Sequence, residues 1–151
     1  IIDATRPEMV FHLAAQPLVS EGYRDPVSTW AVNVVGTANV LDALSDGATV
    51  DVAVVVTTDK VYEIDGRSGP YREGDRLGGR DPYSASKAAA EAVVSAFREV
   101  PGDGSAPLVA TARSGNVIGG GDWSADRLVP DCLRAFGEGR PVVPDGSKIE
   151  V

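Results

Sequence analysis

The sequence predicts an α/β protein with a mostly parallel sheet and flanking helices. Three short apolar runs bounded by turn residues, at 10–15, 50–56 and 108–112, are typical of buried strands. Between them, apolar residues of two longer segments recur with the period of a helix. Strands that alternate with helices indicate βαβ units, in which neighbouring strands run parallel.

The first strand, residues 10–15, ends on two small residues, Ala14 and Ala15, which allow another group to approach the backbone closely. A long helix is then predicted from Pro26 to about Leu44. Proline is favoured at the first helical position, and the apolar residues that follow it keep a helical period.

The second strand, residues 50–56, is nearly all β-branched and continuously apolar, which predicts a central strand covered on both faces. It ends at the polar segment 57–60. Residues 63–81 are rich in Gly, Asp and Arg, so we expect a loop over the carboxyl edge of the sheet. The next helix is predicted from Tyr83 to about Arg98.

The last third of the chain continues this alternation. Residues 108–112 predict a third strand, and the Gly-rich segment 115–121 predicts a turn. Apolar positions from Leu128 to Phe136 predict a third helix, and residues 141–143 a last strand.

Composition narrows the class of protein. The 151 residues are 43% apolar and 24% charged, which is typical of a globular domain. The net charge of -8 argues against nucleic acid and anionic membrane as partners. With one cysteine, Cys132, and one histidine, we expect a cytoplasmic protein without a metal site. The sequence opens at Ile1 without Met, so we also expect it to be part of a longer chain.

Tyr83 and Lys87 are the first candidate site. Four residues apart at the start of a helix, they lie one turn apart on one face. A neighbouring ammonium favours the phenolate and lowers a tyrosine pKa from its ordinary value of about 10, so the phenolate can take a proton from an alcohol. The alternative is a surface tyrosine beside a solvated lysine.

Polar residues follow all three predicted strands, and ligands of open α/β sheets lie at the carboxyl ends of the strands. These ends carry residues 14–16, 57–60 and 113–116, and the Tyr83 helix follows the middle one. A hydroxyl, a tyrosine and a lysine in this order form a set of groups that can remove a proton from an alcohol. Thr58 would orient a substrate alcohol, Tyr83 would be the base, and Lys87 would hold the phenolate and a cofactor ribose.

Five motifs carry a resemblance to a known family: VFHLAAQPLV, NVVGT, TTDKVY, DPYSASK and RSGNVIGGGDW. They resemble the extended short-chain dehydrogenase/reductases, which have a Rossmann-like fold. Among these they are most similar to the sugar-nucleotide 4,6-dehydratases, in particular those of the CDP-glucose type. The resemblance covers the chain to about Asp145. Its most specific parts are residues 116–123 and 58–60, where Lys60 stands in place of the glutamate of the dTDP-glucose and GDP-mannose enzymes.

The resemblance implies an NAD-dependent dehydration without net redox change, which turns a nucleotide sugar into its 4-keto-6-deoxy form. Tyr83 would take the proton of the sugar O4 hydroxyl, with Thr58 positioning that oxygen and Lys87 lowering the tyrosine pKa. Asp59 would be the acid that protonates the departing C6 hydroxyl. Lys60 would be either the base at C5 or an electrostatic stabiliser of the enolate.

Further binding positions follow from the same resemblance. Ala14, Ala15 and Asn33, together with the Tyr83/Lys87 pair, would contact NAD, although strand or helix packing explains the first three equally well. Asn116 and Arg127 match positions that contact the substrate diphosphate. An ordinary place on a helix surface is the alternative for Arg127.

The family pattern begins with a strand, a Gly-rich turn and a helix that do not precede Ile1. The resemblance therefore implies that residues 1–151 form a partial NAD-binding domain that lacks the N-terminal βαβ unit and the C-terminal substrate part, with about 115–151 leading into that part. We expect this chain alone to be inactive and to bind NAD poorly. The complete protein is expected to bind a nucleotide sugar and to form a homodimer.

Two other functions compete with dehydration. An epimerase or reductase of the same superfamily would keep Thr58, Tyr83 and Lys87 without an elimination step, and Asp59 and Lys60 argue against it. The other alternative is a non-catalytic, truncated α/β domain.

Overall fold

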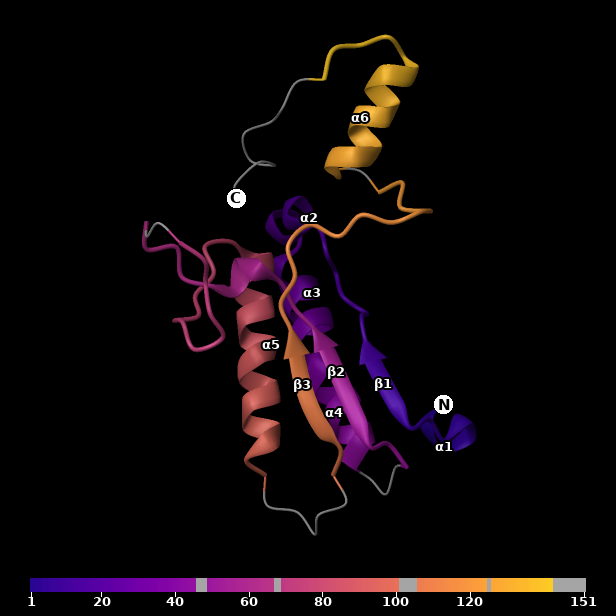
Figure 1. Cartoon of the computed structure of the whole chain (residues 1–151), viewed down its shortest axis with the longest axis vertical. Coiled ribbons are helices and arrows are strands. Elements are labelled where there is room, and N and C mark those ends of the chain that lie inside the picture. The colour runs from indigo at the N-terminus through magenta and orange to yellow at the C-terminus, as the bar shows by residue number, and fades with distance from the viewer. Residues whose placement is uncertain (46–48, 67–68, 101–105, 125, 143–151) are drawn as a thin grey trace. The chain divides into compact units, whose positions relative to one another are not determined.

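The computed structural model describes residues 1–45, 49–66, 69–100, 106–124 and 126–142. The chain forms two units, Ile1–Gly115 and Asn116–Val151. The first contains the sheet and most of the helices, and the second contains helix α6 (Leu128–Gly137), as Figure 1 shows. In the described part of the chain, no helix is both long enough and apolar enough to cross a membrane.

The sheet of the first unit has three parallel strands in the order β1-β2-β3. Their bounds are Met9–His12 for β1, Val52–Val56 for β2 and Leu108–Ala112 for β3. The predicted Rossmann-like, mostly parallel sheet is thus confirmed. Because parallel strands end at the same edge, the segments that follow β1, β2 and β3 leave the sheet side by side.

Helices connect the strands. α1 (Ile2–Thr5) precedes β1. Between β1 and β2 lie α2 (Val19–Arg24), α3 (Pro26–Trp30), the π-helical turn η1 (Ala31–Val35) and α4 (Gly36–Ser45). Between β2 and β3 lie the 3-10 turn η2 (Asp59–Val61) and α5 (Pro82–Arg98). The predicted first long helix is present as the continuous run α3-η1-α4. Its π-helical middle was not predicted, and neither were the short helices α1 and α2.

Both long helical runs begin with the same Asp-Pro signal. The Asp25 side chain accepts a hydrogen bond from the Ser28 amide at the start of α3, and the Asp81 side chain accepts one from the Ser84 amide at the start of α5. Such caps satisfy free amide groups and stabilise a helix by about 1 kcal/mol each. The Asp81 cap places the first turn of α5, and with it Tyr83.

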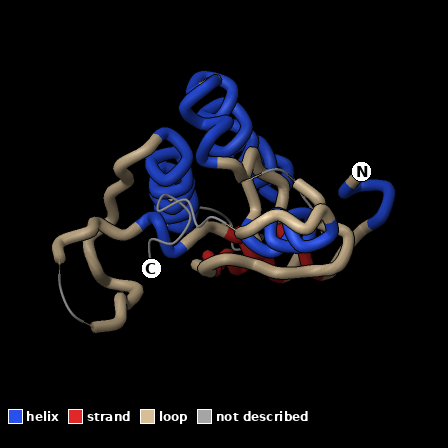
Figure 2. Tube along the Cα trace, turned by 90° about the horizontal axis from the view of Figure 1, so that it is seen from above, coloured by secondary structure: helices blue, strands red, loops and turns tan. Residues whose placement is uncertain are grey.

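The core lies between the sheet and the helices. Leu41 and Leu44 of α4 and Val94 of α5 pack against Ala53 and Val55 of β2. All five are almost completely buried. In Figure 2 the helices of this unit lie on one side of the strands. α4 and α5 are therefore held on one face of the sheet, which positions α5 beside the end of β2.

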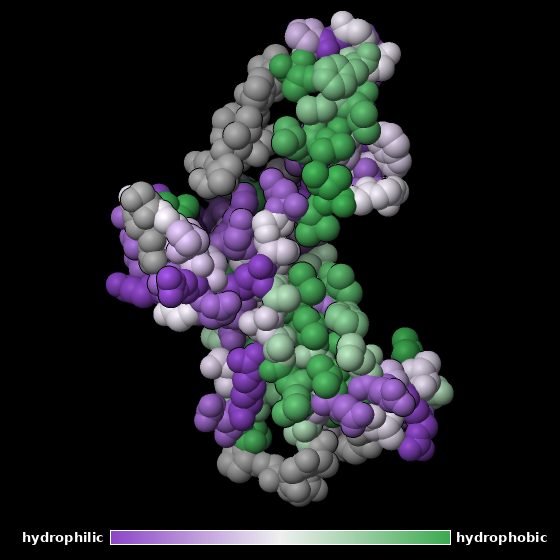
Figure 3. All heavy atoms as spheres, viewed as in Figure 1, coloured by the Kyte–Doolittle hydropathy of each residue, from purple (hydrophilic) through white to green (hydrophobic). Residues whose placement is uncertain are grey.

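The opposite face of the sheet is apolar and open. Alternate strand residues point to opposite faces, and this face consists of Met9, Phe11, Val52, Val54, Val56, Leu108, Ala110 and Ala112. Met9, Phe11 and Leu108 are exposed, and Figure 3 shows the apolar surface over the strands. Within the described part of the first unit, helices cover β2 on one face, so the expectation of two covered faces is wrong there. A continuous apolar run shows that both faces of the strand are suited to burial. It does not show which part of the protein covers each face.

Two strand boundaries also differ from the prediction. The first strand ends at His12, so Ala14 and Ala15 lie in the connection beyond it. Pro141 and Val142 form no strand, and Val143 lies outside the described residues.

Candidate active site

The chain leaves β2 through a tightly held turn. The Thr58 hydroxyl accepts a hydrogen bond from the Lys60 amide at 3.3 Å and donates one to Asp59 Oδ1 at 3.1 Å. The Asp59 amide donates to the Ser114 carbonyl at 2.9 Å. These bonds form the turn η2 and attach it to the segment that follows β3, so two of the predicted strand ends meet here.

The three residues of this turn differ in exposure. Thr58 is 6% exposed, whereas Asp59 and Lys60 are exposed. A side chain at Gly115 would begin 3.2 Å from Asp59 Oδ2, which is a tight contact. The turn thus holds one hydroxyl rigidly and leaves a carboxylate and a lysine accessible at the carboxyl edge of the sheet.

Helix α5 brings the tyrosine and the lysine to the same edge. Tyr83 lies in its first turn and is half-buried, and Lys87 follows one turn later at 7% exposure. Lys87 Nζ donates a hydrogen bond to the Val56 carbonyl at 3.0 Å, at the end of β2. Burial lowers the pKa of Lys87. The Lys87 ammonium is therefore held at Val56, the residue before Thr57, and its roles toward the tyrosine and the cofactor stay predictions.

Two glycines allow close packing around the first turn of α5. A Cβ at Gly22 in α2 would lie 3.2 Å from the Tyr83 amide nitrogen, and one at Gly79 would lie 2.3 Å from the Ala85 nitrogen. The second distance is a clash with backbone, which cannot move aside easily. Gly79 therefore lets the loop before α5 pack directly against the turn that carries Tyr83.

Asn33 ties the segment after β1 to α5. Its amide oxygen accepts from the Gln16 amide at 2.8 Å, and its nitrogen donates to the Gln16 carbonyl at 3.1 Å and to Ser86 Oγ at 2.9 Å. At 1% exposure it is fully satisfied within the protein. Its contact with NAD stays a prediction, as do those of Ala14 and Ala15, and the bridging role was not predicted from the sequence.

A family model described as GDP-mannose 4,6 dehydratase matches residues 1–104. The chain belongs to this family. Over 147 residues it is 44% identical to the CDP-glucose 4,6-dehydratase of Salmonella typhimurium, covering 91% of this chain and 40% of that relative. The chain therefore spans less than half the length of this relative.

Solved structures agree. The dTDP-glucose 4,6-dehydratase DesIV of Streptomyces venezuelae, with NAD bound, matches with a TM-score of 0.78 and 30% identity over 92% of this chain and 42% of its own. MoeE5 in complex with UDP-glucose and NAD matches with a TM-score of 0.74 and 32% identity over 89% and 43%. This member of the dehydratase family is thus an extended short-chain dehydrogenase/reductase, as its motifs indicated.

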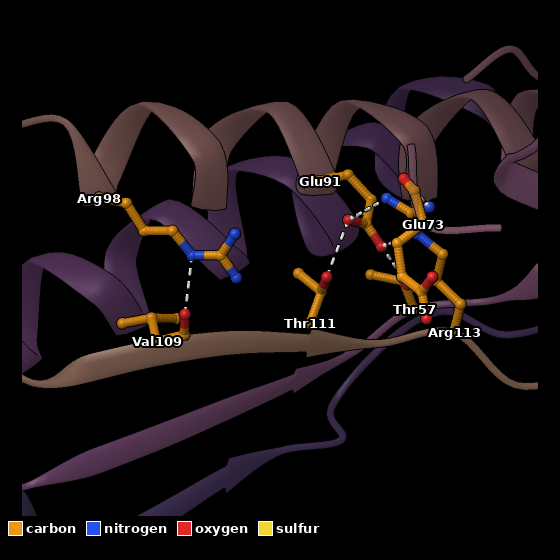
Figure 4. A network of polar contacts seen from close by, with 7 residues as sticks. All are labelled: Thr57, Glu73, Glu91, Arg98, Val109, Thr111 and Arg113. Carbon is orange, nitrogen blue, oxygen red and sulfur yellow. Dashed lines mark hydrogen bonds and ion pairs between the residues drawn. The ribbon is translucent and has the colours of Figure 1, made fainter. Parts of the chain in front are cut away.

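In this dehydratase family member, a buried carboxylate holds the strand ends and α5 together (Figure 4). Glu91 accepts hydrogen bonds from the hydroxyls of Thr57 at 2.5 Å and Thr111 at 2.9 Å, and from Arg113 Nε and Nη2 at 3.0 Å each. Glu91 is 6% exposed. From the sequence, Arg113 was predicted only to lie at the end of the third strand, and no role was predicted for Glu91, although Glu91 continues the Tyr83–Lys87 spacing by one more turn.

Both members of this ion pair are charged. Burial alone would raise the pKa of Glu91, but the hydrogen bonds from Arg113, Thr57 and Thr111 and the charge of Arg113 outweigh it and hold that pKa below its ordinary value. The hydrogen bond with Glu91 in turn raises the pKa of Arg113. The carboxylate is therefore the stable form of Glu91 in the folded protein.

Acid should weaken this ion pair. Because the folded-state pKa of Glu91 is depressed, its contribution to stability is fully present above its ordinary pKa of 4.5 and is lost as the pH falls through the lowered value. We expect Glu91→Gln to lower the unfolding free energy of the complete protein by about 3 kcal/mol at neutral pH, and by less at acid pH. Urea unfolding at several pH values measures this. Glu99→Gln, at an exposed glutamate after α5, is the control, and a pH-independent loss in Glu91→Gln would contradict the assignment.

The two predicted diphosphate contacts, Asn116 and Arg127, belong to the second unit. Arg127 Nε lies 3.8 Å from Asp122 Oδ2, and this buried nitrogen has no hydrogen-bond partner among the described residues. The pKa of Asp122 is lowered by hydrogen bonds from Ser124 and by the charges of Arg127 and Arg134. A buried guanidinium nitrogen without an acceptor suits an anionic ligand.

Proposed function

We propose that the complete protein is a cytoplasmic, NAD-dependent nucleotide-sugar 4,6-dehydratase, a hydro-lyase that converts CDP-glucose to CDP-4-keto-6-deoxyglucose and water. The observation that carries this proposal is the meeting of the turn 58–60 with the Tyr83/Lys87 helix at one edge of the sheet. The similarity to a CDP-glucose 4,6-dehydratase, at 44% identity, supports the choice of nucleotide.

The residues present fit the nicotinamide end of NAD. A buried ammonium, Lys87, lies one helical turn from Tyr83, and small residues, Ala14 and Ala15, follow β1 at the same edge. The lysine can donate a hydrogen bond to a ribose hydroxyl, and the small residues leave room for a ring. Both features suit this part of the cofactor. When bound, NAD supplies the hydride acceptor that makes the reaction neutral in redox terms.

The first step is oxidation at the sugar C4. Thr58 would hold the O4 hydroxyl, because its own hydroxyl is fixed by the turn η2. Tyr83, as a phenolate stabilised by the ammonium of Lys87, would take the O4 proton and become a neutral phenol. The product of this step is a 4-keto sugar, whose carbonyl acidifies the C5 proton.

The second step is elimination across C5 and C6. Asp59 would protonate the departing C6 hydroxyl, and its exposure gives it access to the sugar. Lys60 would act at C5. A neutral lysine would take the C5 proton, whereas an ammonium would stabilise the enolate oxygen.

The proposal also covers the binding of the substrate diphosphate and the formation of a homodimer. We infer that the second unit begins the substrate-binding part, with Asn116 and Arg127 at the diphosphate. This is supported by Arg127 Nε, which has no hydrogen-bond partner among the described residues. A homodimer is supported by exposed apolar residues on the helices, among them Val27 of α3 and Ala92 of α5. Sedimentation of the complete protein tests the dimer.

Product analysis tests the function. The complete protein with NAD should convert CDP-glucose to a 4-keto-6-deoxy product without net NADH formation. The dTDP, UDP and GDP sugars serve as matched substrates and should be converted more slowly. Net accumulation of NADH, or recovery of a C4 epimer, would overturn the dehydratase assignment.

A further inference from the structure

We propose that Glu91 is a positioning residue: together with Arg113, it fixes the register of α5 along the end of β2, and so the place of Tyr83 relative to Thr58. This proposal rests on the proposed function for its kinetic consequences only. Its structural consequence, a register held by one buried carboxylate, can be tested without any substrate.

Two ties one turn apart join α5 to β2. Lys87 Nζ binds the carbonyl of Val56 at 3.0 Å, and the Glu91 carboxylate binds the hydroxyl of Thr57 at 2.5 Å. Two consecutive residues at the end of β2, Val56 and Thr57, are thus bound by two residues of α5 that lie one helical turn apart. A slide of α5 by a single residue, about 1.5 Å, would break both bonds. Because Tyr83 is the next residue up the same helical face, its position follows from this match.

Glu91 is the firmer of the two ties. Its carboxylate receives four hydrogen bonds from three residues, which lie directly after β2, in β3 and directly after β3. Lys87 makes one bond to the strand end, and its ammonium has a proposed role in the chemistry. Charge-assisted, bidentate bonds of the Arg113–Glu91 type fix geometry as well as adding stability. Glu91 can therefore hold α5 while Lys87 engages other groups.

The Glu91 bond also fixes the residue before Thr58. Glu91 holds the Thr57 hydroxyl, and the next residue, Thr58, is held in the turn η2 by Asp59 and the Lys60 amide. One carboxylate thus acts on the tyrosine through the helix and on the threonine through the strand end.

Arg113 extends the same control to the loop that joins η2 to α5. Its Nη1 donates to the Glu73 carbonyl at 3.0 Å, and its guanidinium lies 5.0 Å from the centre of the Tyr62 ring. Tyr62 in turn stacks on Tyr71, with ring centres 4.6 Å apart. The loop before α5 is therefore attached to the same buried pair that fixes the helix.

An ordinary stabilising ion pair is the competing explanation, and Arg98 provides the matched control. Arg98 Nε donates to the Val109 carbonyl at 2.7 Å and ties the far end of α5 to β3 (Figure 4). Its loss removes a tie between the same helix and the sheet, but away from Tyr83. Arg98→Gln should therefore change stability without changing the register at the strand end.

The test compares Glu91→Gln, Thr57→Val and Arg98→Gln in the complete protein with NAD. Glu91→Gln should lower kcat about 30-fold with little change in the KM for CDP-glucose, because misplacement of reacting groups by an ångström costs on the order of 100-fold. Thr57→Val, which removes only a hydroxyl, should act in the same direction and less strongly. Arg98→Gln should keep the wild-type kcat.

Amide hydrogen exchange gives the readout without substrate. Glu91→Gln and Thr57→Val should speed exchange in residues 57–61, and Arg98→Gln should not. A wild-type kcat and wild-type exchange in Thr57→Val would overturn the proposal, and this variant decides if Glu91→Gln does not fold. If the wild type converts no nucleotide sugar, the proposed function fails, whereas the exchange result still supports or overturns the register role.

Discussion

Tyr83→Phe should abolish hydride transfer in the complete protein, lowering turnover by at least about 100-fold. Phenylalanine keeps the aromatic ring but removes the oxygen that would take the O4 proton. Without that base, the alkoxide needed for oxidation at C4 does not form. A single-turnover experiment should therefore show no transient NADH, while CDP-glucose still binds.

Tyr23→Phe is the matched control, because Tyr23 is an exposed tyrosine of α2 outside the proposed site. It should turn over like the wild type. Transient NADH at the wild-type rate in Tyr83→Phe would show that another group takes the O4 proton, and the assignment of Tyr83 would be wrong.

Lys60→Ala should leave oxidation at C4 intact and stop the elimination. The 4-keto sugar and NADH should form at a normal rate and then persist, because the C5 step no longer follows. Exchange of the C5 proton with deuterated water should fall by about 100-fold. Full turnover of Lys60→Ala would contradict the assignment of this residue to the elimination.

Lys60→Arg separates the two roles open to this lysine. Arginine keeps a positive charge but does not act as a base in proteins. If the ammonium stabilises the enolate, Lys60→Arg should retain much of the C5 exchange. Exchange as slow as in Lys60→Ala would instead identify Lys60 as the base.

The sheet and its main helices could be predicted because their signals are local. The apolar run 50–56 and the Asp-Pro pair before Tyr83 each determine an element within a few residues. The π-helical turn η1 could not be predicted, since one extra residue per turn hardly changes the apolar period over a long helix. The short helix α2 was missed because six residues are too few to show a period.

The candidate site was predicted where residues are neighbours in sequence, as in the turn 58–60 and the Tyr83/Lys87 pair. Glu91 was missed because a glutamate four residues after a lysine is usually part of a solvated helix face. Its partners Thr111 and Arg113 are distant in sequence, and only the packing of α5 against β3 brings them to it. The same holds for Asn33, whose partners lie on two other segments.

The fate of the hydrogen at C4 tests the central claim most directly. The complete protein, loaded with NAD, would be given CDP-glucose that carries deuterium at C4, and the product would be examined by NMR. Internal return of the hydride predicts a 4-keto-6-deoxy sugar with the deuterium at C6. Deuterium returned to C4, or retained in released NADH, would show an epimerase or an ordinary dehydrogenase and contradict the account.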